Sequence, residues 1–228
     1  MTDILILGAG GHGRVVLDII LQARSHNPVG FLDNNPDIHG RRIDGLPVLG
    51  GINDLEKLKA SGVRAAVIAI GDNGARRALG DLLESHDFEI VSAIHPSAQL
   101  ARNASIGKGV VIAAGALVCA HCQIGDYAIL NTGCIIDHES MIGMATHICP
   151  GVRLAGHVTV ESGAHIGIGA TVIQNVRIGF EAIVGAGAVV TQDVEPMTTV
   201  VGVPARPIKD APSLAEFATL MSPVTSSR

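Results

Sequence analysis

A repeat with a period of six residues runs through the second half of this 228-residue chain. Every sixth residue from Ile94 to Val190 is Ile, Leu or Val, and the residue four places after each of them is Ala, Val, Cys, Ser or Thr. A period of six fits neither an amphipathic helix nor an alternating strand, but it is typical of a β-helix built from hexapeptide repeats. The period of six is unbroken from Ile94 to Val190, so we expect no inserted loop in the repeat.

The repeat resembles the left-handed parallel β-helix, a triangular prism in which three hexads make one coil. Large rings do not suit so narrow an interior, and the composition agrees, because hydrophobic residues make up 47% of the chain but aromatic residues only 2%. Tyr127 and Phe180, the two rings within the repeat, fall outside its packed positions. We therefore expect a left-handed β-helix over residues 94–209.

Residues 1–93 follow a different pattern, in which short apolar segments alternate with segments of helical periodicity. This alternation predicts a small Rossmann-like α/β domain with a parallel sheet. Residues 210–228 form a third segment, a tail for which we expect a short helix at 214–221. The expected strands of the first domain are 3–7, 29–33, 65–70 and 88–92, and the expected helices are 14–25, 53–60 and 74–85.

A glycine-rich loop joins the first expected strand to the first expected helix. Gly8, Gly10 and Gly13 satisfy the pattern G-x-G-x-x-G, and Asp33 follows at the end of the next strand. In this context the pattern predicts a nucleotide-type ligand at the helix N-terminus, with the acid on a ribose hydroxyl. The alternative is a tight turn without a ligand. NAD chemistry is disfavoured, because this domain makes only one mononucleotide half and a prism is no hydride-transfer domain.

One histidine of the repeat is predicted to be catalytic. Residues that are three hexads apart stack on successive coils of such a prism, and the column of His138 contains Ala120 and Gly156. The imidazole therefore has almost no neighbour above or below it, which leaves room for a substrate. Glu139 follows directly and supplies a carboxylate that orients the ring and raises its basicity.

The other histidines of the repeat have simpler interpretations. His147 and His165 share a column above Ile129, and His147 is a candidate ligand contact. His121, His157 and His165 are interpreted as structural residues.

The sequence predicts neither a metal site nor a covalent intermediate. Cys119 and Cys122 form a C-x-x-C pair, but Cys122 is at a packed position and no second pair completes a structural zinc site. A zinc carbonic anhydrase of the hexapeptide class would need two His five residues apart, and the sequence has no such pair. None of the four cysteines has an obvious base beside it.

Charge and composition exclude other classes of protein. The formal net charge is −5, with 16 basic and 21 acidic residues and no basic cluster, so nucleic acid is not the expected partner. No apolar segment approaches the length of a membrane helix, and the N-terminus does not have the pattern of a signal peptide. We therefore expect a cytoplasmic protein with reduced thiols and no membrane partner.

Several short motifs resemble those of one known family. They are Gly8-Ala-Gly-Gly-His-Gly13, Phe31-Leu-Asp-Asn34, Ala69-Ile-Gly-Asp-Asn73, Ile94-His-Pro-Ser97, Asp137-His-Glu139 and Val201-Gly-Val-Pro-Ala205. Together with the uninterrupted hexads, they are similar to the sugar O-/N-acyltransferases that include the bacterial UDP-amino-sugar N-acetyltransferase of bacillosamine synthesis and the sialic acid O-acetyltransferases. The resemblance spans about residues 1–209.

The resemblance implies a homotrimer that binds acetyl-CoA along the prism, between adjacent subunits, and a nucleotide-sugar in the N-terminal domain. His138 would be the general base and Glu139 its partner. The implied acetyl-CoA contacts are His147, Gly156, Ile168 and Ala186, and the implied substrate contacts are Gly10, Gly11, His12, Asp33, Asn34, Gly71 and Asn131. Gly10 and Asn34 depart from the Ser and Asp of the bacillosamine enzyme, which leaves the sugar and the nucleotide open. Ala186 stands where that enzyme has Gly, so the resemblance implies only a backbone contact there.

Three functions remain open on the sequence alone. The favoured one is an acetyl-CoA-dependent acetyltransferase of an amino sugar that carries a nucleotide, with O-acetylation of sialic acid or a related sugar as the alternative. The second is a nucleotide-binding scaffold with a degenerate prism. The third, an NAD-dependent oxidoreductase, requires NAD(H) binding.

Overall fold

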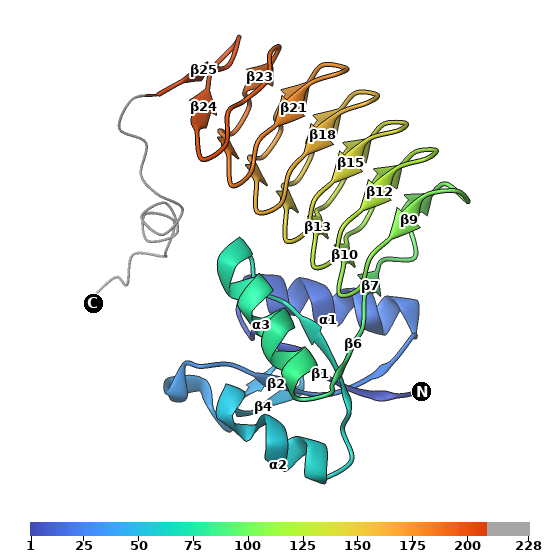
Figure 1. Ribbon diagram of the computed structural model, residues 1–228. Helices are drawn as coiled ribbons and strands as arrows, with labels where there is room; N and C mark the ends of the chain where they lie inside the picture. The colour runs from blue at the N-terminus through green and yellow to red at the C-terminus, as the bar shows by residue number, and fades with distance from the viewer. Residues whose placement is uncertain (209–228) are drawn as a thin grey trace.

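The computed structural model describes residues 1–208 and shows two stacked parts, an α/β domain and a three-sided prism (Figure 1). The predicted Rossmann-like domain and left-handed parallel β-helix are both present. The expected helix at 214–221 lies outside the described residues. Within those residues, none of the helices has the length and apolar character needed to cross a membrane.

A six-stranded sheet in the order β3-β4-β2-β1-β5-β6 forms the centre of the N-terminal domain. Pairing among β2, β1, β5 and β6 is parallel, as predicted, and β4 also runs parallel to β2. The hairpin of β3 and β4 was not predicted, because β3 has only two residues and no apolar pattern. The strands are β1 Asp3–Leu7, β2 Asn27–Leu32, β3 Arg42–Ile43, β4 Leu46–Gly50, β5 Ala65–Ile68 and β6 Glu89–Ile90.

Three α-helices cover this sheet, and each overlaps its predicted range to within a few residues. Helix α1 spans Gly11–Ala23, α2 spans Leu55–Ala60 and α3 spans Asn73–Ser85. Two single-turn 3₁₀ helices, Pro36–Ile38 and Ile52–Asp54, complete the connections.

From β7 to β23 the prism consists of two-residue strands that repeat once in every hexad, and strands three hexads apart pair in parallel. At the end of the prism, β24 has three residues and pairs antiparallel with β25. The strands are β7 Ala93–Ile94, β8 Gln99–Leu100, β9 Ser105–Ile106, β10 Val111–Ile112, β11 Leu117–Val118, β12 Gln123–Ile124, β13 Ile129–Leu130, β14 Ile135–Ile136, β15 Met141–Ile142, β16 His147–Ile148, β17 Arg153–Leu154, β18 Thr159–Val160, β19 His165–Ile166, β20 Thr171–Val172, β21 Arg177–Ile178, β22 Ile183–Val184, β23 Val189–Val190, β24 Thr199–Val201 and β25 Arg206–Pro207.

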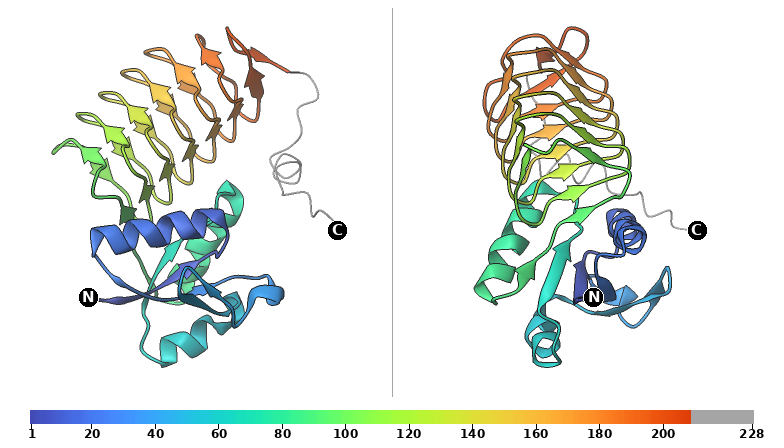
Figure 2. Two further views of the ribbon diagram at one scale, coloured as in Figure 1. Left: turned by 180° about the vertical axis from the view of Figure 1, so that it is seen from behind. Right: turned by 90° about the vertical axis from the view of Figure 1, so that its right-hand side faces the viewer.

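Three faces and three corners define positions on the prism (Figure 2). The first face holds β7, β10, β13, β16, β19, β22, β24 and β25; the second holds β8, β11, β14, β17, β20 and β23; the third holds β9, β12, β15, β18 and β21. A corner is named here by the two faces that it joins. Residues 137–140, for example, lie at the second–third corner, between β14 and β15.

Small aliphatic side chains fill the prism interior. Its cluster of buried residues consists of Val, Ile, Leu, Ala and Cys, so the described interior contains no aromatic ring, as the composition predicted. Tyr127 is buried instead between the prism and α3, where a Cβ on Gly80 would come within 2.6 Å of its ring. Its hydroxyl donates a hydrogen bond to Glu84.

One residue of every hexad from 109 to 187 adopts a left-handed backbone at its corner. Half of these residues are Gly, for which a positive φ is unstrained. His121, Glu139 and His157 are three of the others, with φ near +60°. A non-glycine residue with a positive φ costs free energy, so the backbone is strained at these three residues, which all lie at the second–third corner.

A buried guanidinium fixes the N-terminal domain on the prism. Arg76 of α3 is 0% exposed and donates six hydrogen bonds, five to backbone carbonyls and one to Asn73. Three of the carbonyls, those of Tyr127, Ala145 and Thr146, lie at the third–first corner. Apolar residues of α1 and β1 pack on the first face nearby. The second–third corner is therefore the prism edge opposite the N-terminal domain.

Candidate active site

His138 and Glu139 form a hydrogen-bonded pair at the second–third corner. The distance from His138 Nδ1 to Glu139 Oε2 is 3.1 Å, and both side chains are about half exposed. A carboxylate only accepts hydrogen bonds, so Nδ1 carries the proton and Nε2 is left with a free lone pair. This is the tautomer that a general base needs.

The ring of His138 lies over Gly156, on the next coil. A Cβ on Gly156 would come within 2.5 Å of Cε1 and 2.6 Å of Nε2. The sequence had predicted an open column here, and the structure shows that the imidazole itself occupies the space above Gly156. Gly156 is buried, and because it has no side chain the ring can pack directly on its backbone.

Two kinds of glycine make up the loop between β1 and α1. A Cβ on Gly13 would come within 2.1 Å of the carbonyl oxygen of Gly8, so this position must be Gly for helix and strand to pack. Gly10 and Gly11 are different, because a Cβ at either would meet nothing within 4 Å. Neither has a positive φ. Neither packing nor backbone conformation therefore requires a glycine at 10 or 11, which argues against a turn alone.

Asp33 and Asn34 follow β2 and line a hollow of about 140 Å³ beside Gly8. Asp33 accepts hydrogen bonds from the backbone N–H of Ala9 and of Asn35, both at 2.9 Å. The carboxylate thus anchors the glycine loop, and it retains lone pairs that can accept further hydrogen bonds. Asn34 Oδ1 accepts from the N–H of Ile52 at 3.2 Å.

Four predicted ligand contacts meet where the N-terminal domain touches the first face. His147 Nδ1 lies 3.3 Å from the carbonyl of Gly71, and its Nε2 lies 3.3 Å from Asn131 Nδ2. The ring of His12 is 6.4 Å from that of His147, centroid to centroid. His12 Nε2 is buried without a hydrogen-bond partner, which is costly unless a ligand completes it. A Cβ on Gly71 would meet nothing within 4 Å.

The histidines at this junction are held neutral. Burial, followed by the charge of Arg76, lowers the pKa of His12 to about 4. Burial also lowers the pKa of His147 well below its usual range, with smaller contributions from His165, Arg76 and His12. The pKa of His165 is lowered by burial and by Arg76. These side chains therefore offer neutral nitrogen donors and acceptors at physiological pH.

The thiol of Cys149 corrects one expectation from the sequence. Its Sγ lies 3.4 Å from His165 Nε2, so one cysteine does have a base beside it. Burial raises the pKa of Cys149 to about 12, which keeps the thiol protonated and a poor nucleophile. The four cysteines form no disulfide in the structure, and their reduced state stays a prediction.

Two groups of donor atoms within residues 1–208 are close enough together to hold a metal ion. They are His147, Cys149 and His165, and His138, Glu139 and His157. The positive charge of Arg76 acts on the histidines of the first group, and it would repel a metal cation bound there. The second group is exposed to solvent, and its side chains are already hydrogen-bonded to one another. The absence of a metal remains a prediction.

Ile168 and Ala186, two predicted acetyl-CoA contacts, are exposed at the first–second corner. They occupy equivalent positions on adjacent coils, and the N–H of Gly187 donates to the carbonyl of Ile168 at 2.8 Å. Ile168 is 58% exposed, so this corner presents a large apolar side chain to solvent. The first–second corner is therefore an apolar edge adjacent to the face on which the N-terminal domain sits.

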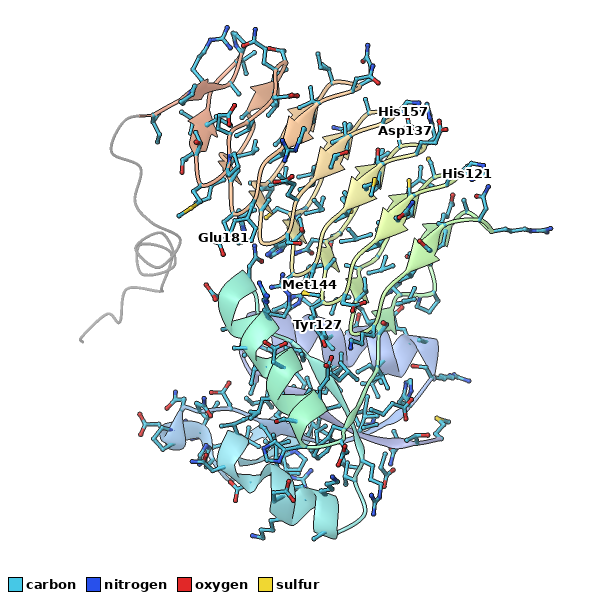
Figure 3. All side chains as sticks on the ribbon, viewed as in Figure 1. His121, Tyr127, Asp137, Met144, His157 and Glu181 are labelled. Carbon is cyan, nitrogen blue, oxygen red and sulfur yellow. The ribbon has the colours of Figure 1, made fainter. Side chains whose placement is uncertain are left out.

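The structure thus divides the predicted site residues between two places on one chain. His138, Glu139 and Gly156 lie at the second–third corner, while the others lie in the N-terminal domain, on the first face or at the first–second corner. In Figure 3, Asp137 and His157 mark the second–third corner, and Tyr127 and Met144 mark the edge next to the N-terminal domain.

Sequence reasoning missed two side chains. Arg76 was overlooked because an arginine on an amphipathic helix is normally exposed, and no sequence pattern marks its burial. His157 was interpreted as structural, although its Nε2 lies 3.0 Å from Glu139 Oε2. The signal that places it there was available, because His157 stands exactly three hexads, or one coil, after Glu139.

Comparisons with known proteins agree with this architecture. The model of the PglD N-terminal domain matches residues 3–83. GDP-perosamine N-acetyltransferase from Escherichia coli O157:H7 is 31% identical over 159 residues, which cover 67% of this chain and 70% of that protein. The chain belongs to this family of hexapeptide-repeat sugar N-acetyltransferases. UDP-N-acetylbacillosamine N-acetyltransferase from Bacillus subtilis (strain 168) is 36% identical over 118 residues, and this match spans about half of each chain.

A solved structure of a family member covers almost the whole fold. It is a histidine-to-asparagine mutant of perosamine N-acetyltransferase from Caulobacter crescentus, in complex with CoA and GDP-perosamine. Its TM-score is 0.88 at 38% identity, and the match covers 92% of this chain and 98% of that one. Family membership places this chain among the acyltransferases and, with the prism described above, disfavours the oxidoreductase and scaffold alternatives.

Proposed function

We propose that this chain transfers an acetyl group from acetyl-CoA to the amine of a nucleotide-linked amino sugar. The observation that carries the proposal is the His138–Glu139 pair, in which the carboxylate fixes the imidazole tautomer and leaves Nε2 free. The names of the relatives support an amine rather than a hydroxyl as the acceptor, because both curated proteins are N-acetyltransferases.

The proposed reaction is a direct attack on the thioester. The neutral sugar amine attacks the thioester carbonyl, and His138 Nε2 accepts a proton from the nitrogen as the C–N bond forms. The tetrahedral intermediate then collapses, the C–S bond breaks, and the proton held by His138 passes to the departing thiolate of CoA. Glu139 stabilises the imidazolium that exists between these steps. General-base assistance of this kind contributes about 10²–10⁴-fold in rate.

The N-terminal domain would hold the nucleotide part of the substrate. Gly10 and Gly11 leave the backbone at the start of α1 accessible, and a helix N-terminus with free N–H groups attracts phosphate. The unpartnered Nε2 of His12 and the open space at Gly71 lie at the same junction. Asp33 and Asn34 line the neighbouring hollow and offer acceptors for sugar hydroxyls.

The separation of the two groups of residues supports a homotrimer. His138 stands at the corner opposite the N-terminal domain of its own chain, so it cannot serve that domain's substrate directly. A second copy that presents its second–third corner to the first–second corner of the first would bring His138 close to Asn131 and His147. Acetyl-CoA would then lie between subunits, in contact with Ile168 and Ala186 of one copy and Gly156 of the other.

Release of CoA tests this function. Purified protein is incubated with acetyl-CoA and, in turn, with GDP-, UDP- and dTDP-linked 4-amino sugars, and free thiol is measured. We expect turnover with at least one of them, and a loss of at least about a hundredfold in His138→Ala. His121→Ala is the matched control, because His121 lies in the same corner column as Glu139 and contacts Asn103 instead. Near-normal turnover by His138→Ala would contradict the mechanism.

A further inference from the structure

Glu139 is shared by two imidazoles. Its Oε2 atom lies 3.1 Å from His138 Nδ1 and 3.0 Å from His157 Nε2. The two rings meet edge to face, with an angle of 88° between planes and centroids 5.3 Å apart. Both imidazoles therefore contact the same carboxylate oxygen, from two successive coils.

We infer that His157 is a positioning residue for the general base and acts through Glu139. The inference rests on the proposed function, since it concerns the side chain that keeps the partner of His138 in place. The carboxylate accepts from both rings, so His157 Nε2 carries a proton and donates it to Oε2. This bond holds Glu139 in the rotamer that faces His138.

The backbone shows why such a support is needed. Glu139 has φ +58°, a left-handed conformation, and its side chain is 49% exposed. An exposed Glu side chain has several rotamers of similar energy, and a single hydrogen bond to an exposed histidine selects weakly among them. A second hydrogen bond to the same oxygen, from His157, favours one rotamer of Glu139 and leaves Nε2 of His138 uncovered.

The stacking of coils brings the donor to this place. His157 stands one coil after Glu139, and its backbone N–H donates to the carbonyl of His138 at 2.9 Å. Main-chain pairing between the two coils therefore fixes the position of the second imidazole relative to the first. His157 also has φ +58°, so its backbone conformation matches that of the turn one coil below.

The sequence of the column supplies a control. His121 lies one coil before Glu139, at the same corner and with φ +60°. Its Nε2 lies 3.0 Å from Asn103 Nδ2, so the ring turns to the coil before it rather than towards Glu139. His121 and His157 thus share residue type, exposure and backbone conformation, and they differ in the contact that the inference requires.

The test uses substitutions that suit the left-handed backbone. His157→Gly removes the ring and relieves the positive φ, so the fold and thermal stability should be retained or slightly improved. We expect kcat to fall about fivefold to tenfold, the effect of a coupling of about 1 kcal/mol. KM for both substrates should stay within about twofold, because the inference gives His157 a contact with Glu139 and none with either substrate. His157→Gln keeps an N–H donor and should restore at least half of the rate, and His121→Gly should match the wild type.

A double-mutant cycle separates this role from a general structural one. In a Glu139→Gln background, His157→Gly should have almost no further effect on kcat, because the carboxylate that it positions is gone. Multiplicative losses would overturn the inference, as would a wild-type kcat in His157→Gly. A fall in kcat and thermal stability together, without rescue by His157→Gln, would also overturn it.

A spectroscopic readout keeps the inference distinct from the proposed function. In protein with isotope-labelled histidine, the ring nitrogen signals of His138 report its Nδ1–H tautomer. We expect His157→Gly, but not His121→Gly, to shift these signals towards a tautomer mixture. Failure of the wild type to release CoA with every sugar would refute the proposed function, whereas unchanged His138 signals in His157→Gly would refute the positioning role.

Discussion

The imidazole of His138 rests on the backbone of Gly156, so closely that a single methyl group there would lie 2.5 Å from Cε1. This contact joins two coils, so the ring is held by Gly156 of the following coil and by Glu139 of its own. The obstacle to a larger residue is a side chain at the surface, not backbone, so the fold has little to lose from the change.

Gly156→Ala should therefore separate activity from stability. We expect the methyl group to tilt the imidazole away from its seat and lower kcat at least about tenfold, with a melting temperature within a few degrees of the wild type. Ala120→Gly, the converse change on the coil below, is the control and should be nearly silent. A wild-type kcat in Gly156→Ala would show that the close contact between Gly156 and the imidazole is not needed for activity.

Two glycines of the β1–α1 loop should behave in opposite ways. Gly10→Ala adds a methyl group in open space, so stability should be unchanged or slightly higher, while affinity for the nucleotide-sugar falls about tenfold or more. Gly13→Ala places a methyl group 2.1 Å from the Gly8 carbonyl and should destabilise the domain severely. Calorimetric titration and thermal unfolding of both variants measure the contrast. Unaltered binding by Gly10→Ala would count against a ligand at this helix end.

Replacing Arg76 tests the junction between the two parts of the molecule. Arg76→Ala removes a donor from five backbone carbonyls. Thr146 still accepts from the N–H of Ile129, and the carbonyl of Gly71 still lies near His147 Nδ1, but the other three lose the donor described here. Each buried group left unsatisfied costs about 1–3 kcal/mol. We expect the free energy of unfolding to fall by more than about 3 kcal/mol in urea titrations. The neighbouring Arg77 is exposed, so Arg77→Ala should change it by less than about 0.5 kcal/mol.

The buried histidines should make the protein sensitive to acid. His12, His147 and His165 all have lowered pKa values in the folded state, so the unfolded chain binds protons more readily below its ordinary histidine pKa of about 6.5. Stability is therefore full above about pH 6.5 and falls as pH decreases towards the folded value, which is about 4 for His12.

Melting temperatures measured between pH 8 and pH 4 check this dependence. His12→Asn should flatten the decline, because one such group is removed, whereas the exposed His121→Asn should leave it unchanged. A His12→Asn protein that loses stability with acid as steeply as the wild type would argue against a neutral, buried His12.

The prism was predictable in detail because its physics is repetitive. A narrow interior admits the same small aliphatic residues at every turn, so Ile94 to Val190 indicate both the period and the absence of rings. The His138–Glu139 pair could be found for a related reason, since the columns of stacked residues follow from the coil length. The junction was not predictable, because Arg76 and Tyr127 are buried by contacts between segments far apart in the sequence. The division of the site residues between two places on the chain was not predictable either, because it depends on how the N-terminal domain sits on the first face.

Coil stacking also fixes the positions along the prism axis in equal steps. Because each coil pairs only with its neighbours, adding or removing one complete coil before His138 would move its corner along the prism axis, relative to the start of the prism, by a whole step of about 4.8 Å, without altering its local geometry. Under the proposed function, a prism of this kind can match the reach of His138 to acceptors of different length through its number of coils. It can leave the packing of the hydrophobic interior unchanged while it does so.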